Sequence, residues 1–321
     1  MAVNLFKKIK WNIIIAIIIM FLILPILPWR YLIHVLTLIF IFASASTYWS
    51  FMGRFGLVSL GHGAFFGLGA YTSSLLFNIY GLSPWIGMFI GGVFATSIAV
   101  IVGYPCFRYG VRGAYFSLVT LALSAAMMYT FSAMRGITGG LLGLTIRYEP
   151  GLLQFQFPEK YYYCYIAISF WLLSIYIWRR IEGGTFIYAL KAMSDDEIFA
   201  EHSGIDLCKV KLQITMLSSF FTAICGTIYA QAISYINPEI AGITWSLEIA
   251  FIAILGGLYS MVGPLIGSAV YISFSEFVRV LLGSTLVGIS HLMLGLLLIV
   301  FTIFLPGGIW GSIRTILFRR M

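Results

Sequence analysis

The sequence predicts an all-α polytopic membrane protein with about ten transmembrane helices, and two observations lead to this fold class. Of its 321 residues, 61% are hydrophobic and only 9% are charged, and the mean hydropathy is +1.00. Soluble domains carry roughly 25% charged residues, so lipid must surround most of this chain. In addition, apolar stretches of about 20 residues, the length that spans a bilayer as a helix, recur along the sequence. We expect one membrane domain over residues 1–321.

Ten apolar stretches are candidate membrane spans. They cover residues 11–28, 31–52, 57–79, 85–106, 114–134, 161–178, 213–234, 244–258, 264–282 and 286–305. A count of eight, which also keeps both termini on one side, is the alternative. The third, eighth and ninth stretches are rich in Gly and Ser, and the eighth is short. We therefore expect broken or re-entrant segments there, which a membrane protein tolerates where other parts of the protein shield them.

The basic residues are divided unevenly between the two sides of this topology. Five of the 19 lysines and arginines lie on one side: Arg30, Arg135, Arg147, Lys160 and Arg279. The other fourteen share a side with both termini and with the loop 179–212. Cytoplasmic segments are enriched in Lys and Arg, so we expect both termini and this loop in the cytosol. Topology thus explains the net charge of +8 better than nucleic-acid binding does.

The loop 179–212 is the most charged part of the chain. Six of the eleven acidic residues lie between Glu182 and Asp206, and the sequence on either side is apolar. In a membrane protein, a compact charged segment between apolar spans is typical of a surface that another protein binds.

A short helix is predicted within this loop. Ser194 and Glu197 form a Ser-x-x-Glu capping pattern and Gly204 suits a helix C-terminus, which predicts a helix over 195–203. Three side chains share one of its faces by their spacing: Ile198, Phe199 and His202. A capped helix with an apolar edge favours insertion into a partner's groove over a solvated connector.

A glycine-rich segment at the start of the third stretch contains an ionisable residue. Gly61, Gly63, Gly67 and Gly69 expose backbone and permit close helix packing. His62 lies among them, and ionisable residues inside membrane segments are often functional. A role in a translocation path and a structural hydrogen bond to a neighbouring helix are both open for His62.

Two further segments are candidates for a translocation path. Glu248 lies just inside the eighth stretch; it could bind a substrate amine or pair with Arg279, but a place in the first helical turn is favoured. Thr138, Gly139 and Gly140 begin the external loop, where glycine-rich backbone can donate hydrogen bonds to a carboxylate. An ordinary flexible loop is the better interpretation of these three residues.

Sequence motifs for catalysis are absent. There is no Gly-x4-Gly-Lys-Ser/Thr phosphate loop, no Gly-x-Ser-x-Gly elbow and no His-Glu-x-x-His. The four cysteines, Cys106, Cys164, Cys208 and Cys225, form no Cys-x-x-Cys pair and no cluster with metal-ligand spacing. We therefore expect a chain that is not an enzyme, hydrolyses no ATP itself and holds no cofactor or metal.

Taken in order, the glycine-rich and charged motifs resemble those of the LivM type of branched-chain amino acid ABC transporter permease. The resemblance rests on Ser59-Leu-Gly-His-Gly-Ala-Phe-Phe-Gly-Leu-Gly-Ala-Tyr71, on residues 197–211, on Asn237-Pro238-Glu239 and on residues 255–267. It extends over about residues 13–305. Each glycine motif is weak alone, whereas their order and spacing together are specific.

The resemblance implies a permease subunit of a bacterial inner-membrane importer for branched-chain amino acids. Its partners would be a LivH-like permease, two cytosolic ATP-binding subunits and a periplasmic amino-acid-binding protein. The loop 179–212 would then hold the coupling helix that docks on an ATP-binding subunit. The docking residues carried over in this way, together with the capping and apolar residues above, are Asp195, Asp196, Glu197, Ile198, Phe199, Ala200, Glu201 and Gly204.

Two alternatives concern the cargo and the energy source. The family commonly has a polar pair after Thr-Gly-Gly, where this chain has Leu141 and Leu142, and close relatives carry urea or short amides. A stand-alone secondary carrier would need several acids within the membrane for coupling ions. Only Glu248 and Glu276 lie within the predicted spans, which favours transport driven by a separate ATPase through alternating access.

Overall fold

A computed structural model describes residues 30–282, 292, 295, 296, 299, 303, 304 and 307–312. The span predicted at 11–28 lies outside these residues, as does most of the span predicted at 286–305.

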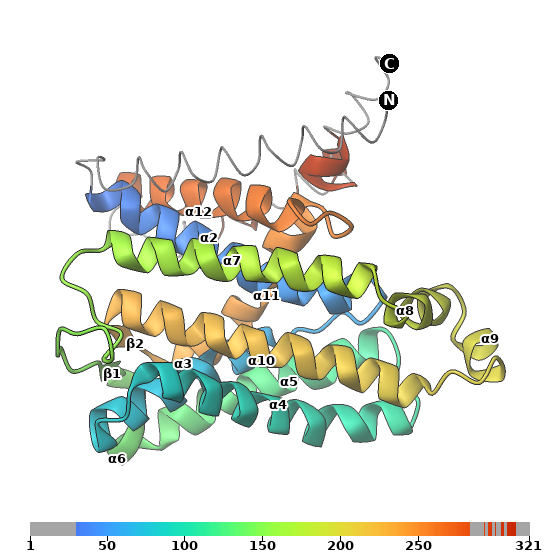
Figure 1. Cartoon of the computed structure of the whole chain (residues 1–321), viewed down its shortest axis with the longest axis horizontal. Coiled ribbons are helices and arrows are strands. Elements are labelled where there is room, and N and C mark those ends of the chain that lie inside the picture. The colour runs from blue at the N-terminus through green and yellow to red at the C-terminus, as the bar shows by residue number, and fades with distance from the viewer. Residues whose placement is uncertain are drawn as a thin grey trace.

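The described elements are almost all helical (Figure 1). In chain order they are α2 (Arg30–Gly53), α3 (His62–Tyr80), α4 (Pro84–Arg108), α5 (Ala114–Ala133), α6 (Arg135–Thr138), the 3-10 helix η2 (Gly140–Leu142), β1 (Leu144–Thr145), α7 (Tyr161–Glu182), α8 (Phe186–Asp195), α9 (Glu197–His202), α10 (Leu207–Ile233), β2 (Tyr235–Ile236), the 3-10 helix η3 (Pro238–Ala241), α11 (Ile243–Gly256) and α12 (Gly263–Leu282).

Six of the described helices are long and apolar enough to cross a membrane. They are α2, α4, α5, α7, α10 and α12, and they confirm the spans predicted at 31–52, 85–106, 114–134, 161–178, 213–234 and 264–282. The 19-residue helix α3 is less apolar because it contains His62 and several glycines and serines. With six such helices the chain is a multi-pass membrane protein, whereas the predicted total of ten spans is not reached within the described residues.

The expectation of broken segments is correct for one of the three stretches. α3 runs without interruption from His62 to Tyr80, and only residues 57–61 before it are non-helical. α12 is also continuous. α11 has just 14 residues and ends at Gly256, because the next residue, Gly257, has a φ of +115°. That conformation is open to glycine but strained for other residues.

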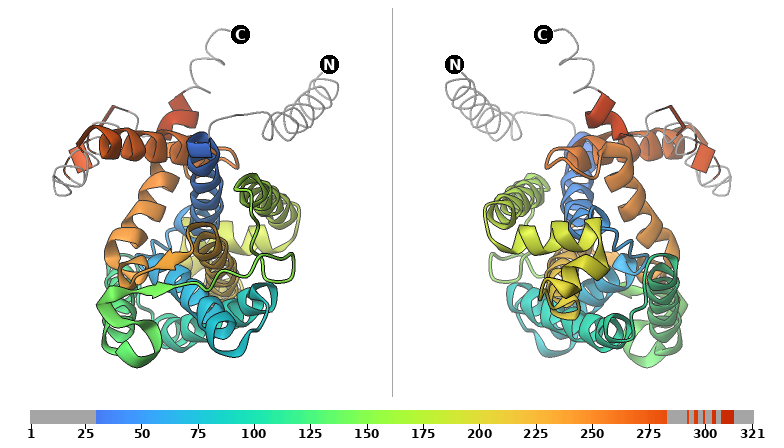
Figure 2. Two further views of the ribbon diagram at one scale, coloured as in Figure 1. Left: turned by 90° about the vertical axis from the view of Figure 1, so that its left-hand side faces the viewer. Right: turned by 90° about the vertical axis from the view of Figure 1, so that its right-hand side faces the viewer.

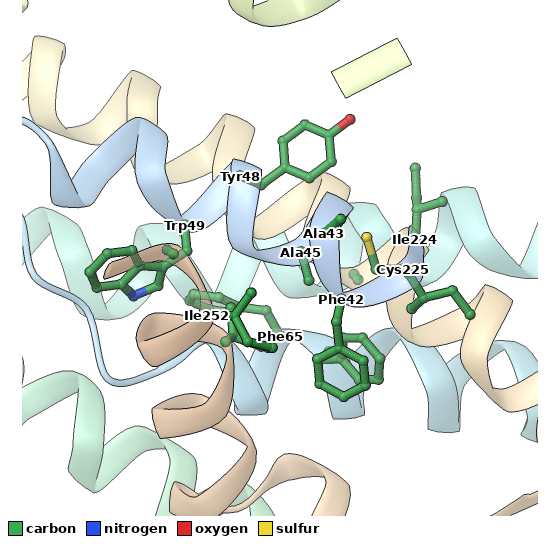
Figure 3. Packing of buried hydrophobic residues seen from close by; sticks show 14 of the residues in the cluster. Phe42, Ala43, Ala45, Tyr48, Trp49, Phe65, Ile224, Cys225 and Ile252 are labelled. Atoms are coloured by element: carbon green, nitrogen blue, oxygen red, sulfur yellow. The ribbon is translucent and has the colours of Figure 1, made fainter. Parts of the chain in front are cut away.

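α2 and α10 run through the interior of the bundle (Figure 2). α10 packs against α3, α4 and α2, and α2 also packs against α7, α11 and α12. The large side chains of Tyr48 and Trp49 point to different sides of α2, and those of Phe65, Ile224 and Cys225 belong to the same buried cluster (Figure 3). Removing such residues from contact with lipid and filling the space between helices gives a close-packed interior.

Glycines set the closest helix contacts. A Cβ atom at Gly69 of α3 would lie 1.9 Å from the carbonyl oxygen of Ala223 on α10, and one at Gly226 of α10 would lie 1.9 Å from that of Phe66 on α3. α11 and α12 meet in the same way, because a Cβ at Gly256 would lie 1.8 Å from the carbonyl oxygen of Gly263. Small residues let backbones approach where lipid provides no hydrophobic drive for association.

The two ends of the bundle differ in character. At one end β1 pairs antiparallel with β2, Leu144 opposite Ile236, beside α6 and η2. At the other end the chain leaves α7 and forms α8 and α9 before it returns as α10 (Figure 1). The charged loop of the sequence is thus an arm at one end of the molecule.

Candidate functional site

The charged arm contains two helices where the sequence predicts one. Ser194 and Asp195 belong to the end of α8, so the predicted start at residue 195 and the Ser194 cap are wrong. α9 begins at Glu197, and Asp196 caps it: one carboxylate oxygen accepts hydrogen bonds from the backbone N–H groups of Ile198, at 2.8 Å, and Phe199, at 3.1 Å. An aspartate is as good an N-cap as a serine.

The predicted end of this helix is confirmed. Gly204 has a φ of +84° and follows the C-cap Ser203. Its N–H donates to the carbonyl oxygen of Glu201, and the N–H of Ile205 donates to that of Ala200. A glycine in the left-handed conformation closes the last turn in this manner.

α9 presents apolar side chains to the surroundings. Phe199 is 71% exposed and Ile198 is 59% exposed, while Ala200 on the opposite face is buried. His202 is exposed as well, so the three residues predicted to share a face all lie open. Neighbouring exposed apolar residues on a short, capped helix provide the kind of edge that a groove on another protein can bind.

Glu197 joins α9 to the rest of the molecule. One of its carboxylate oxygens lies 2.7 Å from the Nζ of Lys211 on α10, and the other lies 2.8 Å from the Nε of Arg112, which precedes α5. The side chain of Lys211 is only 5% exposed. A cavity of about 460 Å³ lies between α9, the start of α10 and residues 107–112.

A second ion pair lies at the same end of the bundle. Arg54, which follows α2, is buried against the ring of Trp178 and pairs with Glu182 at 3.0 Å. Burial lowers the pKa of the Arg54 guanidinium, and the hydrogen bond and charge of Glu182 oppose that shift. The pair therefore ties the end of α2 to the end of α7.

The sequence did not identify Arg54, Arg112 or Lys211 as functional residues. Their importance comes from ion pairs between residues far apart in the chain. For Lys211 a signal exists, since a lysine one turn inside an apolar helix needs a partner; for Arg112 and Arg54 the residues around them give none.

His62 lies in the interior and has a partner at each ring nitrogen. Nδ1 lies 3.2 Å from the Ser59 Oγ, and Nε2 lies 2.8 Å from the Ser218 Oγ of α10. The Ser218 hydroxyl donates to the carbonyl oxygen of Tyr48, so it is free to accept from Nε2–H. The contacts therefore fit a neutral imidazole protonated on Nε2, which links α3 to α10 and α2.

Removing this link will lower stability by a moderate amount. Replacing His62 by leucine retains the volume but leaves the Ser59 and Ser218 hydroxyls without their ring partner, which costs about 2 kcal/mol in the free energy of unfolding. Titration with SDS in mixed micelles measures this loss. Ser97→Ala is the control because the Ser97 hydroxyl donates only within its own helix, to Val93. Equal stability of the two variants would contradict a structural role for the ring.

The glycines around His62 lie against neighbouring backbone. A Cβ at Gly63 would lie 2.5 Å from the carbonyl oxygen of Gly242, one at Gly67 would lie 2.5 Å from the side chain of Ala241, and one at Gly61 would lie 3.0 Å from Thr120. This half of α3 is therefore pressed against α5, η3 and the start of α11.

A polar seam runs through that contact. The Ser246 hydroxyl of α11 lies 2.7 Å from the Ser124 hydroxyl of α5 and accepts a hydrogen bond of 2.8 Å from the backbone N–H of Gly63. The Ser124 hydroxyl also lies 3.2 Å from the carbonyl oxygen of Leu60. Three helices thus meet through small polar groups.

Thr138, Gly139 and Gly140 form an ordered turn at the opposite end of the molecule. The buried Thr138 hydroxyl donates to the carbonyl oxygen of Phe131 at 2.6 Å and accepts from the N–H of Gly140. Gly139 and Gly140 have φ angles of +77° and +58°. Leu142, which follows them, is 86% exposed. The segment is therefore a closed turn, in contrast to the flexible loop that the sequence favours.

Glu248 lies half-buried beside Tyr271 of α12, in the second turn of α11 and not in the first turn that the sequence favours. The predicted alternative of a pair with Arg279 is not found, since Arg279 pairs with Glu276 on its own helix. The Tyr31 hydroxyl of α2 also donates to Glu276, at 2.9 Å. Both acids predicted within the spans therefore have partners in the structure.

The structure brings the docking residues together and separates the translocation candidates. The docking residues, within 195–204, lie together on the arm, whereas His62 and its glycines lie in the interior and Thr138–Gly140 lie at the far end. Among the residues that the structure describes, no group of His, Cys, Asp and Glu could hold a metal ion. The arm is therefore the strongest candidate for a functional surface.

Comparison with known proteins points to membrane transport. The sequence pattern of the family described as "Branched-chain amino acid transport system / permease component" matches residues 31–302. The high-affinity branched-chain amino acid transport system permease protein LivM of Escherichia coli K12 is 26% identical over 286 residues, which cover 82% of this chain and 66% of that protein. The chain thus spans slightly less than two thirds of this relative's length.

More distant relatives are also membrane permeases. A probable LivM of Methanocaldococcus jannaschii is 21% identical over 76% of this chain and 77% of its own length. The ribose import permease protein RbsC of Haemophilus influenzae is 25% identical over 58% of this chain and 55% of its own length. No solved structure is significantly similar to the chain.

Proposed function

The chain belongs to the family of branched-chain amino acid transport system permease components, and from this premise we propose that it is the membrane subunit of an ATP-binding-cassette importer for branched-chain amino acids. The family match covers most of the chain, and LivM proteins are among its relatives. As a permease, the chain is a transport component, and the chemistry of ATP hydrolysis belongs to other subunits.

The exposed edge of α9 carries the proposal. Ile198 and Phe199 stand open at the end of a capped helix on a charged arm. A groove on an ATP-binding subunit would cover this edge, with residues 195–204 as the docking segment. Burial of two large apolar side chains at the centre of a small interface provides much of its binding energy.

The remaining partners follow from the same premise. They are a LivH-like second permease, a second ATP-binding subunit and a periplasmic amino-acid-binding protein. Nucleotide binding would draw the ATP-binding subunits together, and α9 would pass that movement to the membrane helices, which open alternately to either side.

We propose a bacterial inner membrane as the location, and the charge distribution supports a cytosolic position for the arm. Eight described basic residues lie at the α8–α9 end of the bundle: Arg54, Arg108, Arg112, Arg179, Arg180, Lys191, Lys209 and Lys211. Arg30, Arg135, Arg147, Lys160 and Arg279 lie towards the other end. By the positive-inside rule we propose that the arm lies in the cytosol, and with ten spans both termini would lie on the same side.

The path for the cargo, in this proposal, follows the contact of α3 with α5, η3 and α11, where Gly61, His62, Gly63 and Gly67 lie and Glu248 is close by on α11. The hydrogen-bonded groups of Gly63, Ser124 and Ser246 place polar atoms along this contact, and its small residues let the helix backbones approach closely. At the outer end, the turn formed by Thr138, Gly139 and Gly140 would border the entrance.

Removing the apolar edge of α9 tests the docking role. In the double variant Ile198→Ser, Phe199→Ser we expect co-purification of the ATP-binding subunits to fall more than about tenfold. Truncation of interface anchors costs more than about 1.4 kcal/mol of binding free energy, which corresponds to this factor. Leucine uptake into proteoliposomes containing the whole complex should fall in parallel.

Tyr80→Ser is the matched control. Tyr80 is 72% exposed, as Phe199 is, but it lies at the opposite end of the bundle. Undiminished binding of the ATP-binding subunits to the α9 variant, at wild-type levels of folded protein, would reject the docking role. Uptake of urea in place of leucine by the intact complex would instead reject the cargo.

A further inference from the structure

We propose that Glu197 is a positioning residue that fastens α9 to α10 and to the connection between α4 and α5, so that movement of α9 reaches both through paired charges. This inference rests on the proposed function, in which a soluble partner binds α9. It assigns Glu197 to contacts within the chain and leaves the partner contact to the exposed apolar edge.

The carboxylate of Glu197 is already used within the molecule. Each of its oxygens faces a different cation, Lys211 at 2.7 Å and Arg112 at 2.8 Å, and only 23% of the side chain is exposed. Oε1 accepts a hydrogen bond from Lys211, whereas Oε2 is buried and has only the ion pair with Arg112, so neither oxygen is open to a second protein. The same two contacts connect three separate stretches of chain: α9, α10 and the segment before α5.

Without these ion pairs α9 has few attachments. It contains six residues, and Ala200 is its buried one. Its larger side chains, Ile198 and Phe199, point away from the bundle. Its packing is mainly against α8, the other helix of the same arm. The cavity of about 460 Å³ beside α9 leaves that side unpacked as well.

The two ion pairs differ in strength for a physical reason. Lys211 is almost fully buried, so its ammonium group loses hydration that Glu197 must replace, and the pair is hard to break. The side chain of Arg112 is 48% exposed, so water weakens this contact. We infer that α9 moves with α10 as one unit, while the Arg112 contact can exchange as the α4–α5 connection shifts.

The other charged groups around the cavity do not duplicate this role. Arg108, Glu201 and Asp206 also line it. Asp206 caps α10 through the N–H of Lys209 and pairs with the exposed Lys209 ammonium, and these contacts lower the pKa of its carboxyl group. Its interactions therefore remain within the first turn of α10.

Hydrogen–deuterium exchange on the purified full-length chain tests the proposal directly. In Glu197→Gln we expect exchange of the amides of residues 197–204 to become at least about tenfold faster, because a charged hydrogen-bond pair no longer holds the helix. Asp206→Asn is the control: asparagine still caps α10, and exchange in α9 should stay unchanged. Unchanged exchange in Glu197→Gln would overturn the proposal.

The assembled transporter provides the second readout. Glu197→Gln should still co-purify with the ATP-binding subunits, yet transport fewer leucine molecules per ATP hydrolysed. Loss of the ATP-binding subunits with normal exchange in α9 would make Glu197 a direct partner contact and overturn the proposal. Should Glu197→Gln fold poorly, Glu197→Gln with Lys211→Met removes both charges and is compared in the same assays.

These outcomes are distinguishable from failure of the proposed function. If the Ile198→Ser, Phe199→Ser variant binds the ATP-binding subunits normally, α9 is not their docking site. The exchange measurement on the chain alone still decides whether Glu197 holds α9 in place.

Discussion

Replacing Gly226 by alanine will separate α10 from α3 and destabilise the protein by more than about 3 kcal/mol, beyond the usual cost of overpacking a protein interior. The added methyl would lie 1.9 Å from the carbonyl oxygen of Phe66, and this oxygen belongs to a helix backbone that cannot move aside locally. The SDS midpoint of unfolding in mixed micelles measures the effect.

The loss of stability is large because α3 and α10 approach each other closely at two glycines, one on each helix. Gly69 of α3 faces α10 as closely as Gly226 faces α3, so both contacts lengthen when either one is filled. Thr227 of α10 also donates to the carbonyl oxygen of Gly69, at 3.0 Å, and this bond would break. Gly136→Ala is the control, since nothing lies within 4 Å of its Cβ position. A loss as large in Gly136→Ala would show that alanine at any glycine is harmful.

Replacing Glu182 by glutamine will cost about 3 kcal/mol, because the buried Arg54 guanidinium loses its counter-charge. The Arg54 side chain is 5% exposed and lies 3.9 Å from the Trp178 ring, whereas Glu182 is 39% exposed, which places the cost at the lower end of the range for buried pairs. Unfolding in mixed micelles again provides the measurement.

The double variant separates charge from packing. In Arg54→Met with Glu182→Gln no buried charge remains, and methionine fills much of the space against Trp178. We expect the double variant to be more stable than Glu182→Gln alone. The opposite order would mean that the guanidinium stabilises the protein through its aromatic contacts even without the carboxylate.

The membrane helices are predictable because their signal is local. An apolar run of about 20 residues forms a helix in lipid whatever it packs against, and α4, for example, begins at Pro84 within one residue of its predicted limit. α11 is an exception because it is too short to span the bilayer, and the Gly256–Gly257 pair in the sequence indicates where it ends. The total number of spans depends on segments outside the described residues.

The arm shows where local signals compete. Ser194 and Asp196 are both good caps, and the sequence alone favours Ser194 because Glu197 completes its pattern. In the structure Leu190 and Met193 are buried on one face of α8. This packing keeps α8 helical through Ser194, so the next cap, Asp196, starts α9. Tertiary contact thus decides between two acceptable helix starts.

Ion pairs are the least predictable part of the candidate site. Arg112 lies 85 residues before Glu197 in the chain, and Arg54 lies 128 residues before Glu182. Pairing requires the fold to be known first. For the same reason the sequence left both roles of His62 open, whereas its contacts to Ser59 and Ser218 point to the structural one.

The short helix α11 has a consequence for how the protein is made. At about 1.5 Å per residue its 14 residues extend about 21 Å, less than the roughly 30 Å of hydrocarbon in a bilayer. The insertion machinery would therefore not release α11 into lipid as an independent segment. Its glycine contacts with α12 bring the two helices together as a hairpin. We therefore expect α11 and α12 to enter the membrane together and to pack against α2, which precedes them in the chain.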